Sequence, residues 1–560
     1  MQSLPTAPLK PHYKVLIIGA GINGCGVFRD LSLQGVDCLL IDRGDICEGA
    51  SAAPSRLIHG GIKYLETGEF RLVRESAVER NRLLRNAPHY VKPLETVVPV
   101  QSWLGGIVPS ALRLLGFKAK LNDRGAAITE LGLRIYDAYN RKVRALPDHR
   151  FFGTAKLRRA YPGFDRKIIA AGLYYEGRIT HAERLGLELV MDGLAANAGS
   201  ALRTYTCAEA TGDGTMQLVD QLTGARLQIA TEVIINAGGA WIDKVNAGLG
   251  ITSHHMGGSK GSHLIVDSPP LHDALDGRMI YFGTADGRVN LVYPFFGNVL
   301  VGSTDIPVKD PDEACCSEQE TDYLLGVVKE ILPDIALSRD QIRLIYCGVR
   351  PLPRSEGVDI GAVSRDHAVA EDALSVTGQP VLSLIGGKWT TFRAFSEQVT
   401  DRVLTLFGET RKVSTEDLAI GGGRGFPSTD LEQRQWVRSL ADTHDLDSLR
   451  AELLLARYGT QAEKVAAFIK LNEDSPLRSL RGYSAREILY LAQAEPTRRL
   501  ADILLRRTAI AMEGLLTPDV IIETADLVAA AQGWDADRIA SEVTHAMREL
   551  ARRQPGDGGA

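Results

Sequence analysis

The sequence predicts an α/β chain with a Rossmann-like dinucleotide-binding domain, an interleaved antiparallel-sheet domain and an all-helical C-terminal domain. Three observations support this class: a glycine-rich turn between an apolar strand and a helix near the start, short strands with turn residues over 279–305, and helical periodicity after residue 427. The length of 560 residues corresponds to about three or four domains.

Composition and charge exclude several classes of protein. The 64 Lys and Arg residues against 69 Asp and Glu residues give a net charge of −5, so no basic field favours nucleic acid. The seven cysteines are scattered and form no C-x-x-C pair, which argues against a disulfide framework or a metal site and favours a reducing compartment. The first residues lack a signal-peptide core, and no apolar run reaches the roughly 18–20 residues that cross a bilayer. We therefore expect a protein that is cytoplasmic or sits on a membrane surface and does not cross a membrane.

The first chemical signal is a nucleotide-binding fingerprint. An apolar strand at 13–18 is followed by a glycine turn, a helix and a second strand at 38–41. The turn holds Gly19, Gly21 and Gly24, and the second strand ends at Asp42. Such glycines let backbone amides approach a pyrophosphate at the positive end of the helix, and the acid accepts from the adenosine ribose. The fingerprint predicts a dinucleotide site but does not choose between NAD and FAD.

Later segments favour FAD. The fingerprint stands almost at the start of the chain, and small residues at 49–51 follow the second strand. Two further apolar strands end in glycines, at 231–239 and 381–393, and the second leads into a helix that Thr390 or Thr391 could cap. A helix N-terminus there would stabilise negative charge on a reduced flavin. The predicted cofactor-binding residues in these segments are Gly19, Gly21, Gly24, Asp42, Ser51, Gly238, Gly386, Gly387 and Thr390.

One segment carries a family resemblance. Residues 55–66, Ser-Arg-Leu-Ile-His-Gly-Gly-Ile-Lys-Tyr-Leu-Glu, and the following 69–75 resemble the FAD-dependent glycerol-3-phosphate dehydrogenases, within the glycine/D-amino-acid oxidase-like flavoproteins. Further stretches agree in the order of the family, namely 260–263, 301–305, 347–351, 364–366 and 386–393. The resemblance runs from about residue 13 to 400, and a looser likeness continues to Asp-Ile-Leu-Leu-Arg-Arg-Thr at 502–508.

The resemblance implies an activity and a set of site residues. The activity is oxidation of sn-glycerol 3-phosphate to dihydroxyacetone phosphate by hydride transfer from C2 to flavin N5, with electrons passed to a membrane quinone. A phosphate dianion needs cations around it. By resemblance, Arg350 and Arg365 are substrate-site arginines and Lys388 is the site lysine. Lys63 and Tyr64 match an Arg-Tyr pair of the family, and lysine at this position keeps the charge but loses the fork geometry.

The substrate alcohol also needs a proton acceptor, and histidine titrates in the right range. Among the twelve histidines, His263 and His59 lie in motifs of the resemblance. We expect His263 near the substrate, in a catalytic group with Lys388 and Arg350. His59 is either a flavin contact or structural, and the sequence leaves open which histidine takes the proton.

The chain divides into interleaved parts. We expect a discontinuous FAD-binding domain over 12–95, 180–250 and 340–412, with a substrate domain over 96–179 and 251–339. The pattern at 418–427 predicts a glycine-rich linker, followed by a helical C-terminal domain at 425–552 and a flexible tail at 553–560. The helical domain would serve in packing, in self-association as a homodimer, or in presentation to a partner.

Individual helices follow from apolar spacing and capping residues. A helix at 69–87 is expected to show its arginines on a solvated face. In the C-terminal domain the pattern predicts one helix beginning at Thr517-Pro518 and ending at Gly533, and another capped by Asp535. Four further helices are predicted at 431–443, 446–458, 485–494 and 497–507.

One segment bears on membrane contact. Residues 103–120 are apolar with three basic residues at the end, which is typical of an interfacial segment and equally of a buried hairpin. The implied quinone acceptor is the stronger reason to expect peripheral attachment, on the inner face of the cytoplasmic membrane.

Four alternatives stay open at this point. The first two are a dehydrogenase of a longer phosphorylated polyol, such as erythritol phosphate, and an oxidase that uses oxygen. A flavoprotein scaffold or nucleic-acid modifier is disfavoured by the acidic balance. The remaining alternative is a plain NAD dehydrogenase.

Overall fold

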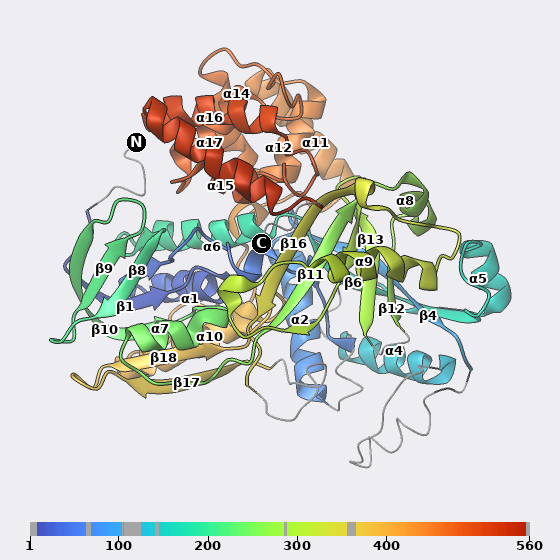
Figure 1. Cartoon of the computed structure of the whole chain (residues 1–560), viewed down its shortest axis with the longest axis horizontal. Helices are drawn as coiled ribbons and strands as arrows, with labels where there is room; N and C mark the ends of the chain where they lie inside the picture. The colour runs from blue at the N-terminus through green and yellow to red at the C-terminus, as the bar shows by residue number, and fades with distance from the viewer. Residues whose placement is uncertain are drawn as a thin grey trace.

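The computed structural model describes residues 8–62, 69–103, 105, 125–140, 145–284, 288–354 and 366–555. Two sheets lie side by side, and the C-terminal helices, drawn orange to red, lie above them in Figure 1. The predicted class, an α/β fold with a second, mostly antiparallel sheet and a helical C-terminal domain, is confirmed.

The first sheet has a parallel centre. Strand β1 pairs in parallel with β10 and β2, and β18 continues the parallel run beside β10. Along the sheet the order is β17 (Ala368–Ala373), β18 (Pro380–Ile385), β10 (Arg226–Asn236), β1 (His12–Ile18), β2 (Cys38–Ile41) and β7 (Ala201–Arg203), with the hairpin of β8 (Thr206–Ala210) and β9 (Met216–Asp220) attached to β10.

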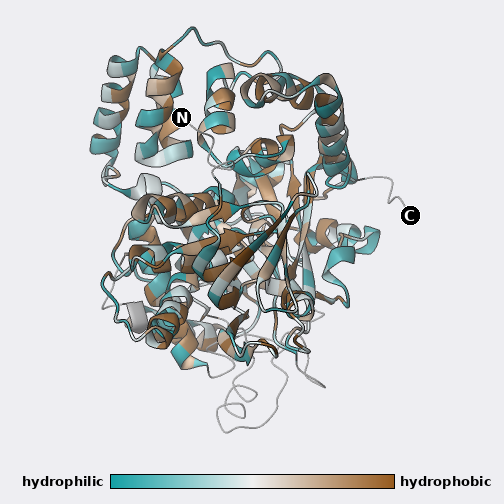
Figure 2. Ribbon diagram, turned by 90° about the vertical axis from the view of Figure 1, so that its left-hand side faces the viewer, coloured by the Kyte–Doolittle hydropathy of each residue, from teal (hydrophilic) through white to brown (hydrophobic). Residues whose placement is uncertain are grey.

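The two faces of this sheet are covered differently. Alternate residues of β1 point to opposite faces, so Val15 and Ile17 join one core while Leu16 and Ile18 join another. In Figure 2 the strands in the interior of the molecule are mostly brown, the colour of apolar residues. The first core contains the apolar sides of three helices, α1 (Ile22–Leu33), α6 (Ala182–Ala196) and α10 (Phe392–Leu406), whereas the β8–β9 hairpin and α7 (Ile242–Gly248) lie on the second.

The second sheet has ten strands and is mostly antiparallel. Its central order is β15 (Ile306–Pro307), β11 (Ser259–Val266), β14 (Asn298–Gly302), β13 (Val289–Phe295), β12 (Met279–Gly283), β4 (Val91–Val100), β6 (Ala170–Ile179) and β3 (Leu57–Ile58), with β16 (Ile342–Arg350) beside β11 and β5 (Arg150–Phe152) beside β6. The meander predicted over 279–305 is confirmed as β12, β13 and β14.

Five helices accompany this sheet: α2 (Phe70–Asn86), α4 (Ala126–Asn140), α5 (Thr154–Ala160), α8 (Pro269–Leu275) and α9 (Glu318–Val327). The predicted helix at 69–87 is confirmed as α2. The expected solvated face is wrong for Arg80, because this side chain is buried and its guanidinium lies 3.1 Å from the Glu176 carboxylate. A buried arginine needs such a partner.

The predicted division into domains stays a prediction, and two strands bear on its boundaries. Strand β16 pairs with β11 along its whole length, although the expected FAD-binding domain included 340–350. Strand β4 likewise pairs with β6 from Val91 onward. The backbone hydrogen bonds therefore attach both strands to the second sheet.

The C-terminal domain is helical as predicted. Its helices are α11 (Asp430–His444), α12 (Ser448–Tyr458), α13 (Ala462–Lys470), α14 (Ala485–Ala494), α15 (Leu500–Asp502), α16 (Pro518–Gln532) and α17 (Ala536–Ala551). The predicted boundaries hold where capping residues mark them, since Thr517 and Asp535 both accept from a backbone N–H in the first turn. The sequence reading missed α13.

Three expectations about this region need correction. The helix predicted at 497–507 is instead the short α15 followed by a five-residue π-turn, Ile503–Arg507. The glycines at 421–423 are not an open linker, because they are buried and a Cβ on Gly422 or Gly423 would overlap a backbone carbonyl. Arg553, at the start of the expected tail, accepts a 2.7 Å hydrogen bond from Ile345 N of β16.

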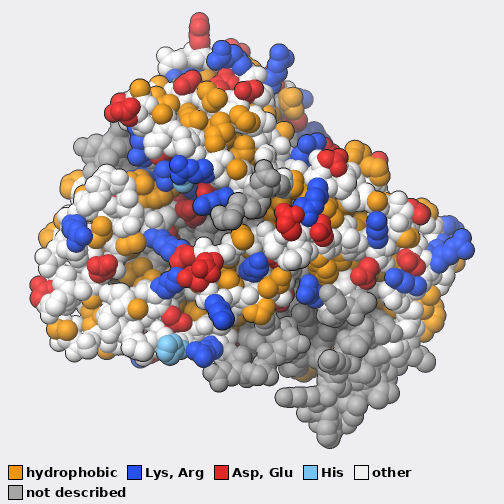
Figure 3. Space-filling view, viewed as in Figure 1, with side chains coloured by type: hydrophobic (Ala, Val, Ile, Leu, Met, Phe, Trp, Pro, Cys, Tyr) orange, Lys and Arg blue, Asp and Glu red, His pale blue; other side chains and the backbone are white. Residues whose placement is uncertain are grey.

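No helix in the described part of the chain has both the length and the apolarity to cross a membrane. Most of the 103–120 segment considered for interfacial contact lies outside the described residues. Basic and acidic side chains are interspersed on the face shown in Figure 3, in keeping with the nearly balanced sequence charge.

Candidate functional site

The predicted cofactor loops meet at one edge of the first sheet. Because β1, β2, β10 and β18 run parallel, their carboxyl ends lie together, and the loops that follow them start at that edge. Two hydrogen bonds tie the loops directly to their neighbours. Gly19 N donates to Ile41 O at 2.8 Å, and Ala237 N donates to Ile18 O at 2.8 Å.

The glycine turn requires glycine at two of its three positions. Gly19 has φ +111°, and a Cβ there would lie 2.5 Å from Ala237 O. A Cβ on Gly24 would overlap the carbonyl oxygen of Gly19. Gly21 differs, because its backbone is in an ordinary extended conformation and a Cβ would lie 3.3 Å from Ser51 Oγ. Gly19 and Gly24 thus shape the turn, while Gly21 keeps the N-terminus of α1 open.

Ser51 and Asp42 both hydrogen-bond the backbone of this turn. Ile22 N donates to Ser51 Oγ at 2.9 Å. Ala20 N and Gly44 N donate to the two oxygens of Asp42, at 2.6 and 2.8 Å. Burial raises the pKa of the Asp42 carboxyl to about 6, and these backbone hydrogen bonds oppose the rise. Asp42 therefore orients the turn itself, in addition to its predicted contact with a ribose.

The later glycines pack on the same turn. Gly386 and Gly387 have φ of +74° and +88°, and Asn23 Nδ2 donates to Gly386 O at 3.2 Å. Gly238 N donates to Asn236 Oδ1 at 3.1 Å, at the end of β10. Three segments that are far apart in the sequence, 19–24, 237–239 and 386–387, thereby form one cradle.

The expected helix cap at 390–391 is wrong. Thr391 occupies the N-cap position of α10 but makes no side-chain cap hydrogen bond. Thr390 Oγ1 instead donates to His59 O at 3.2 Å. Thr390 and His59 are thus joined through the His59 backbone.

The cradle fits FAD. Its glycines leave the helix N-terminus accessible to a pyrophosphate, as the dinucleotide motif requires. Two buried polar atoms at the cradle, Asn23 Oδ1 and Thr391 Oγ1, have no hydrogen-bond partner within the described chain. Buried polar atoms are otherwise nearly always paired, which indicates that a ligand completes this site.

The second sheet contributes His263 and Arg350. On the paired strands β11 and β16, His263 lies opposite Tyr346 and Ser259 lies opposite Arg350. Directly opposed residues share a face of the sheet, and so do alternate residues of a strand. His263 and Arg350 therefore point from the same face.

This face is turned toward the segment that follows Ser51. A Cβ on Gly348, between Tyr346 and Arg350, would lie 2.6 Å from Ala53 Cβ. Tyr346 donates to Pro54 O at 3.2 Å. The glycine thus lets the second sheet approach the cofactor loops.

His263 lies in a buried, aromatic environment. It is 1% exposed, its ring stacks on Tyr346 with centroids 4.8 Å apart, and Nε2 shares a 2.8 Å hydrogen bond with Ser55 Oγ. Burial, together with the charges of Arg350 and Arg56, lowers its pKa well below the usual value. The imidazole is therefore neutral at pH 7, and its Nδ1 has no hydrogen-bond partner within the described chain.

Arg350 is oriented by the adjoining loop. Its guanidinium donates to Asp305 Oδ1 at 3.1 Å, Ser303 Oγ at 3.2 Å and Thr304 O at 3.1 Å. A Cβ on Gly261 would overlap this guanidinium, so glycine on β11 gives Arg350 its space.

Lys388 lies at the cofactor cradle, one residue after Gly387. Its Nζ donates to Ser76 Oγ of α2 at 3.3 Å. The adjacent Trp389 donates from Nε1 to Ser51 O at 3.2 Å. The segment from Ser51 to His59 thus contacts both the loop of Lys388 and the sheet face of His263 and Arg350. Three predicted substrate residues, Lys63, Tyr64 and Arg365, lie outside the described residues.

Four polar residues of this region were not predicted as site residues from the sequence. Asn23 lies inside the glycine fingerprint, and Ser303 and Asp305 lie inside the 301–305 stretch, so the motifs themselves were the signal. Tyr346 directly precedes the 347–351 stretch. Only the strand pairing shows that Tyr346 stacks on His263.

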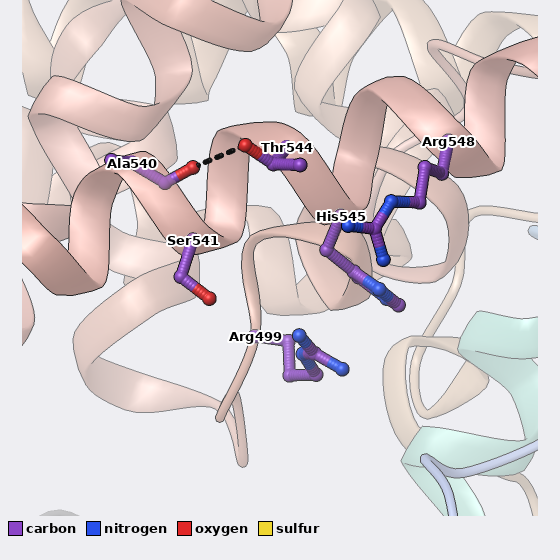
Figure 4. Close-up of a pocket in the computed structure, with 6 residues that line it drawn as sticks. All are labelled: Arg499, Ala540, Ser541, Thr544, His545 and Arg548. Carbon is purple, nitrogen blue, oxygen red and sulfur yellow. Dashed lines mark hydrogen bonds between the residues drawn. The ribbon is translucent and has the colours of Figure 1, made fainter.

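A separate recess lies on the helical domain, between α17 and the start of α15. It has a volume of about 500 Å³ and is lined by Arg499, Ala540, Ser541, Thr544, His545 and Arg548 (Figure 4). None of these residues was predicted from the sequence as a catalytic or binding residue. The recess is distinct from the cofactor loops.

Comparison with protein families agrees with this arrangement. Residues 14–393 match the family of FAD dependent oxidoreductases. Residues 413–539 match the C-terminal domain of alpha-glycerophosphate oxidase. The second match covers the helical domain, which the sequence resemblance reached only loosely.

Individual relatives span nearly the whole chain. A glycerol-3-phosphate dehydrogenase of Synechocystis sp. is 32% identical over 89% of this chain and 89% of its own length. A D-erythritol 1-phosphate dehydrogenase of Brucella abortus is 29% identical over 88% of this chain and 93% of its own length.

A solved structure shows the same fold. It is the glycerol-3-phosphate dehydrogenase from Bacillus halodurans complexed with FAD, with a TM-score of 0.76 and 20% identity over 98% of this chain and 97% of that chain. The predicted cofactor, FAD, and the predicted oxidoreductase class are confirmed by the family match. The chain belongs to the family of FAD dependent oxidoreductases.

Proposed function

We propose that this chain oxidises sn-glycerol 3-phosphate to dihydroxyacetone phosphate. The observation that carries the proposal is the shared sheet face of His263 and Arg350, a neutral proton acceptor and a cation turned toward the FAD-binding loops. The names of the relatives supply the substrate class, since several are glycerol-3-phosphate dehydrogenases.

Each residue has a defined part in this proposal. Arg350 and Lys388, with Lys63, Tyr64 and Arg365 from the sequence, bind the phosphate through charge-assisted hydrogen bonds. His263 receives the C2 hydroxyl proton at a ring nitrogen, which its lowered pKa keeps available at neutral pH. The residues of the cradle would hold FAD, whose N5 would supply the acceptor for the hydride from C2.

The cofactor is held by the cradle. The N-terminus of α1, left open by Gly21, faces the pyrophosphate, and Asp42 and Ser51 hold the adenosine side. Gly238, Gly386, Gly387, Thr390 and the His59 backbone border the remaining part. We further propose a membrane quinone as the electron acceptor, with peripheral attachment to the inner face of the cytoplasmic membrane.

A second candidate substrate is a longer polyol phosphate. The Brucella abortus relative, a D-erythritol 1-phosphate dehydrogenase, matches over 88% of this chain, close to the 89% that the Synechocystis glycerol-3-phosphate dehydrogenase matches. Lys63, where the resemblance leads us to expect arginine, is the residue in this sequence that favours an altered phosphate pocket.

An anaerobic visible spectrum tests the proposal and separates the two substrates. Purified holoprotein is titrated with sn-glycerol 3-phosphate and, in parallel, with D-erythritol 1-phosphate. We expect the flavin band to bleach with the first at lower concentration. Bleaching only with the second would move the assignment to the longer substrate, and bleaching with neither would contradict the proposal. Re-oxidation by a quinone but not by oxygen would support the acceptor.

A further inference from the structure

The sequence motif at 502–508 has no part in the function proposed so far, yet the structure places it beside the cofactor loops. Its two arginines, Arg506 and Arg507, are buried at 5% and 1% exposure. They lie in the π-turn after α15, a geometry that often marks functional sites. Both point at Asp45, only three residues after Asp42.

The contact is a dense charge cluster. Arg507 donates to both carboxylate oxygens of Asp45, at 2.7 and 2.8 Å, and Arg506 donates to Asp45 Oδ2 at 2.6 Å. Asp45 is completely buried. Burial by itself would raise the pKa of Asp45, but the two arginines outweigh burial and lower it, so the carboxylate stays charged.

Asp502 and Tyr205 fix the geometry of this cluster. Asp502 Oδ1 accepts from Arg506 Nη2 at 2.8 Å and from Tyr205 OH at 2.5 Å. Tyr205 in turn donates from its backbone N to Gly44 O at 2.8 Å. The residue before Asp45 is therefore held as well.

The same loop holds the cofactor residues. Gly44 N donates to Asp42 Oδ1, Ala20 N donates to Asp42 Oδ2, and Cys47 N donates to Ala20 O at 2.9 Å. The loop then continues to Ser51, whose hydroxyl accepts from Ile22 N. A displacement of Asp45 would thus move Asp42 and the glycine turn.

We propose that Arg506 and Arg507 are positioning residues for FAD: by holding Asp45 they fix the 42–51 loop at the adenosine side of the cofactor, so that FAD affinity depends on the helical C-terminal domain. This inference rests on the cofactor placement given under the proposed function. The helical domain thereby has a role beyond packing, self-association or presentation to a partner.

Contacts other than those at Asp45 also attach the helical domain to the first sheet and its helices. Arg184 of α6 and Glu495 form a second buried ion pair of 2.8 Å between the same two parts of the chain, and Arg184 also donates to the backbone carbonyl of Arg507 at 2.9 Å, a bond that needs no Arg507 side chain. Arg498 adds a hydrogen bond to Thr204 O at 3.0 Å. Loss of one arginine at Asp45 therefore leaves the helical domain attached.

The test measures FAD affinity in the full-length protein by flavin fluorescence. We expect Arg507→Met to raise the FAD dissociation constant by about tenfold or more, because the buried Asp45 carboxylate loses two of its three arginine hydrogen bonds and keeps only that from Arg506, which relaxes the loop. The matched control is Arg457→Met, a buried arginine in α12 that pairs with Glu487 within the helical domain. It should lower the melting temperature but leave the dissociation constant within about twofold. Equal dissociation constants in the two variants would overturn the proposal.

A second variant keeps the test decisive if Arg507→Met folds poorly. Asp45→Asn removes the charge that the arginines hold, and we expect it to weaken FAD binding to a similar degree. In the double variant the two effects should be less than additive, because both act through one contact. Full additivity would contradict the shared mechanism.

Gly21→Val separates this inference from the cofactor assignment itself. If Gly21→Val loses FAD while both Arg507→Met and Asp45→Asn bind it normally, the cradle is correct and the role of the arginines is wrong. If Gly21→Val also binds FAD normally, the cofactor placement is wrong and the inference falls with it.

Discussion

At the residue scale, His263 owes its chemistry to its surroundings. Burial and the charges of Arg350 and Arg56 lower its pKa and keep the ring neutral, and a neutral imidazole can accept a proton at pH 7. The hydrogen bond with Ser55 orients Nε2. The sequence contains twelve histidines, so the neutral, oriented ring of His263 follows from its surroundings and not from its residue type.

Substitution of His263 should reduce turnover without loss of flavin. We expect His263→Asn to lower kcat by about 10²- to 10⁴-fold, the usual contribution of a positioned general base. Steady-state kinetics with a dye acceptor and the flavin absorbance measure the two quantities. His181→Asn is the control, because His181 is also buried with a lowered pKa, but its Nδ1 shares a hydrogen bond with Thr180 Oγ1. Similar losses of kcat in both variants would contradict the role of His263.

The pH dependence follows from the direction of the same shift. A histidine with a lowered pKa is neutral above that pKa, so kcat/KM should stay level from pH 8 down to pH 6.5 and fall only at lower pH. A pH–rate profile checks this. An acid limb centred above pH 6.5 would show that another group takes the proton.

Arg350 should act on substrate affinity. We expect Arg350→Ala to raise KM for the phosphate substrate by about 10- to 100-fold, because charge-assisted hydrogen bonds to the phosphate are lost. Arg343→Ala is the control, since Arg343 lies on the same strand but pairs with Asp267 at the surface. An unchanged KM in Arg350→Ala would remove this arginine from the phosphate site.

At the element scale, the glycines of the turn between β1 and α1 have two different roles, one in packing and one in cofactor binding. Gly24 is required by packing, since any side chain would overlap the Gly19 carbonyl, whereas Gly21 has an ordinary backbone conformation. The first therefore serves the fold, and the second serves the approach of the cofactor.

This difference predicts opposite outcomes for two similar substitutions. Gly21→Val should fold and melt near the parent temperature but purify without the yellow flavin, because its side chain blocks the helix N-terminus. Gly24→Val should destabilise the protein by about 3 kcal/mol or more through the backbone clash. Circular dichroism and the flavin-to-protein absorbance ratio measure both outcomes. Normal flavin content in Gly21→Val would contradict the cradle.

At the scale of the whole molecule, the helical domain shares a core with the second sheet. Apolar residues of β13, β14 and β16 join those of α12, α14 and α16 in one cluster. Buried ion pairs add specific contacts to the first sheet, where Arg184 of α6 meets Glu495. The three parts are therefore packed as one body.

Removal of one partner of this pair should be costly. We expect Glu495→Gln to destabilise the protein by about 3–5 kcal/mol, because the Arg184 charge stays buried without its carboxylate. Thermal unfolding measures the change. Glu371→Gln is the control, because Glu371 and its partner Arg402 are both exposed and such surface pairs contribute about 0–1 kcal/mol. A similarly small effect at Glu495 would show that the apolar core alone docks the domain.

The local structural features of this protein could be predicted from its amino-acid sequence. The glycine turn, the meander at 279–305 and the capped helices α16 and α17 were predictable, because sterics and capping act between residues that are neighbours in the chain. The family motifs likewise identified Gly21, His263 and Arg350 as residues to examine.

Which of these residues lie in contact with one another follows from the tertiary structure alone. The pairing of β11 with β16 places His263 beside Tyr346 and on the face of Arg350, and the fold brings Arg507 to Asp45 across 462 positions. The sequence predicts Thr390 or Thr391 as a helix cap, whereas in the structure Thr391 makes no side-chain cap hydrogen bond and Thr390 Oγ1 donates to His59 O. Such partners are set by strand register and by the burial of charge, which depend on distant segments and leave no local pattern in the sequence.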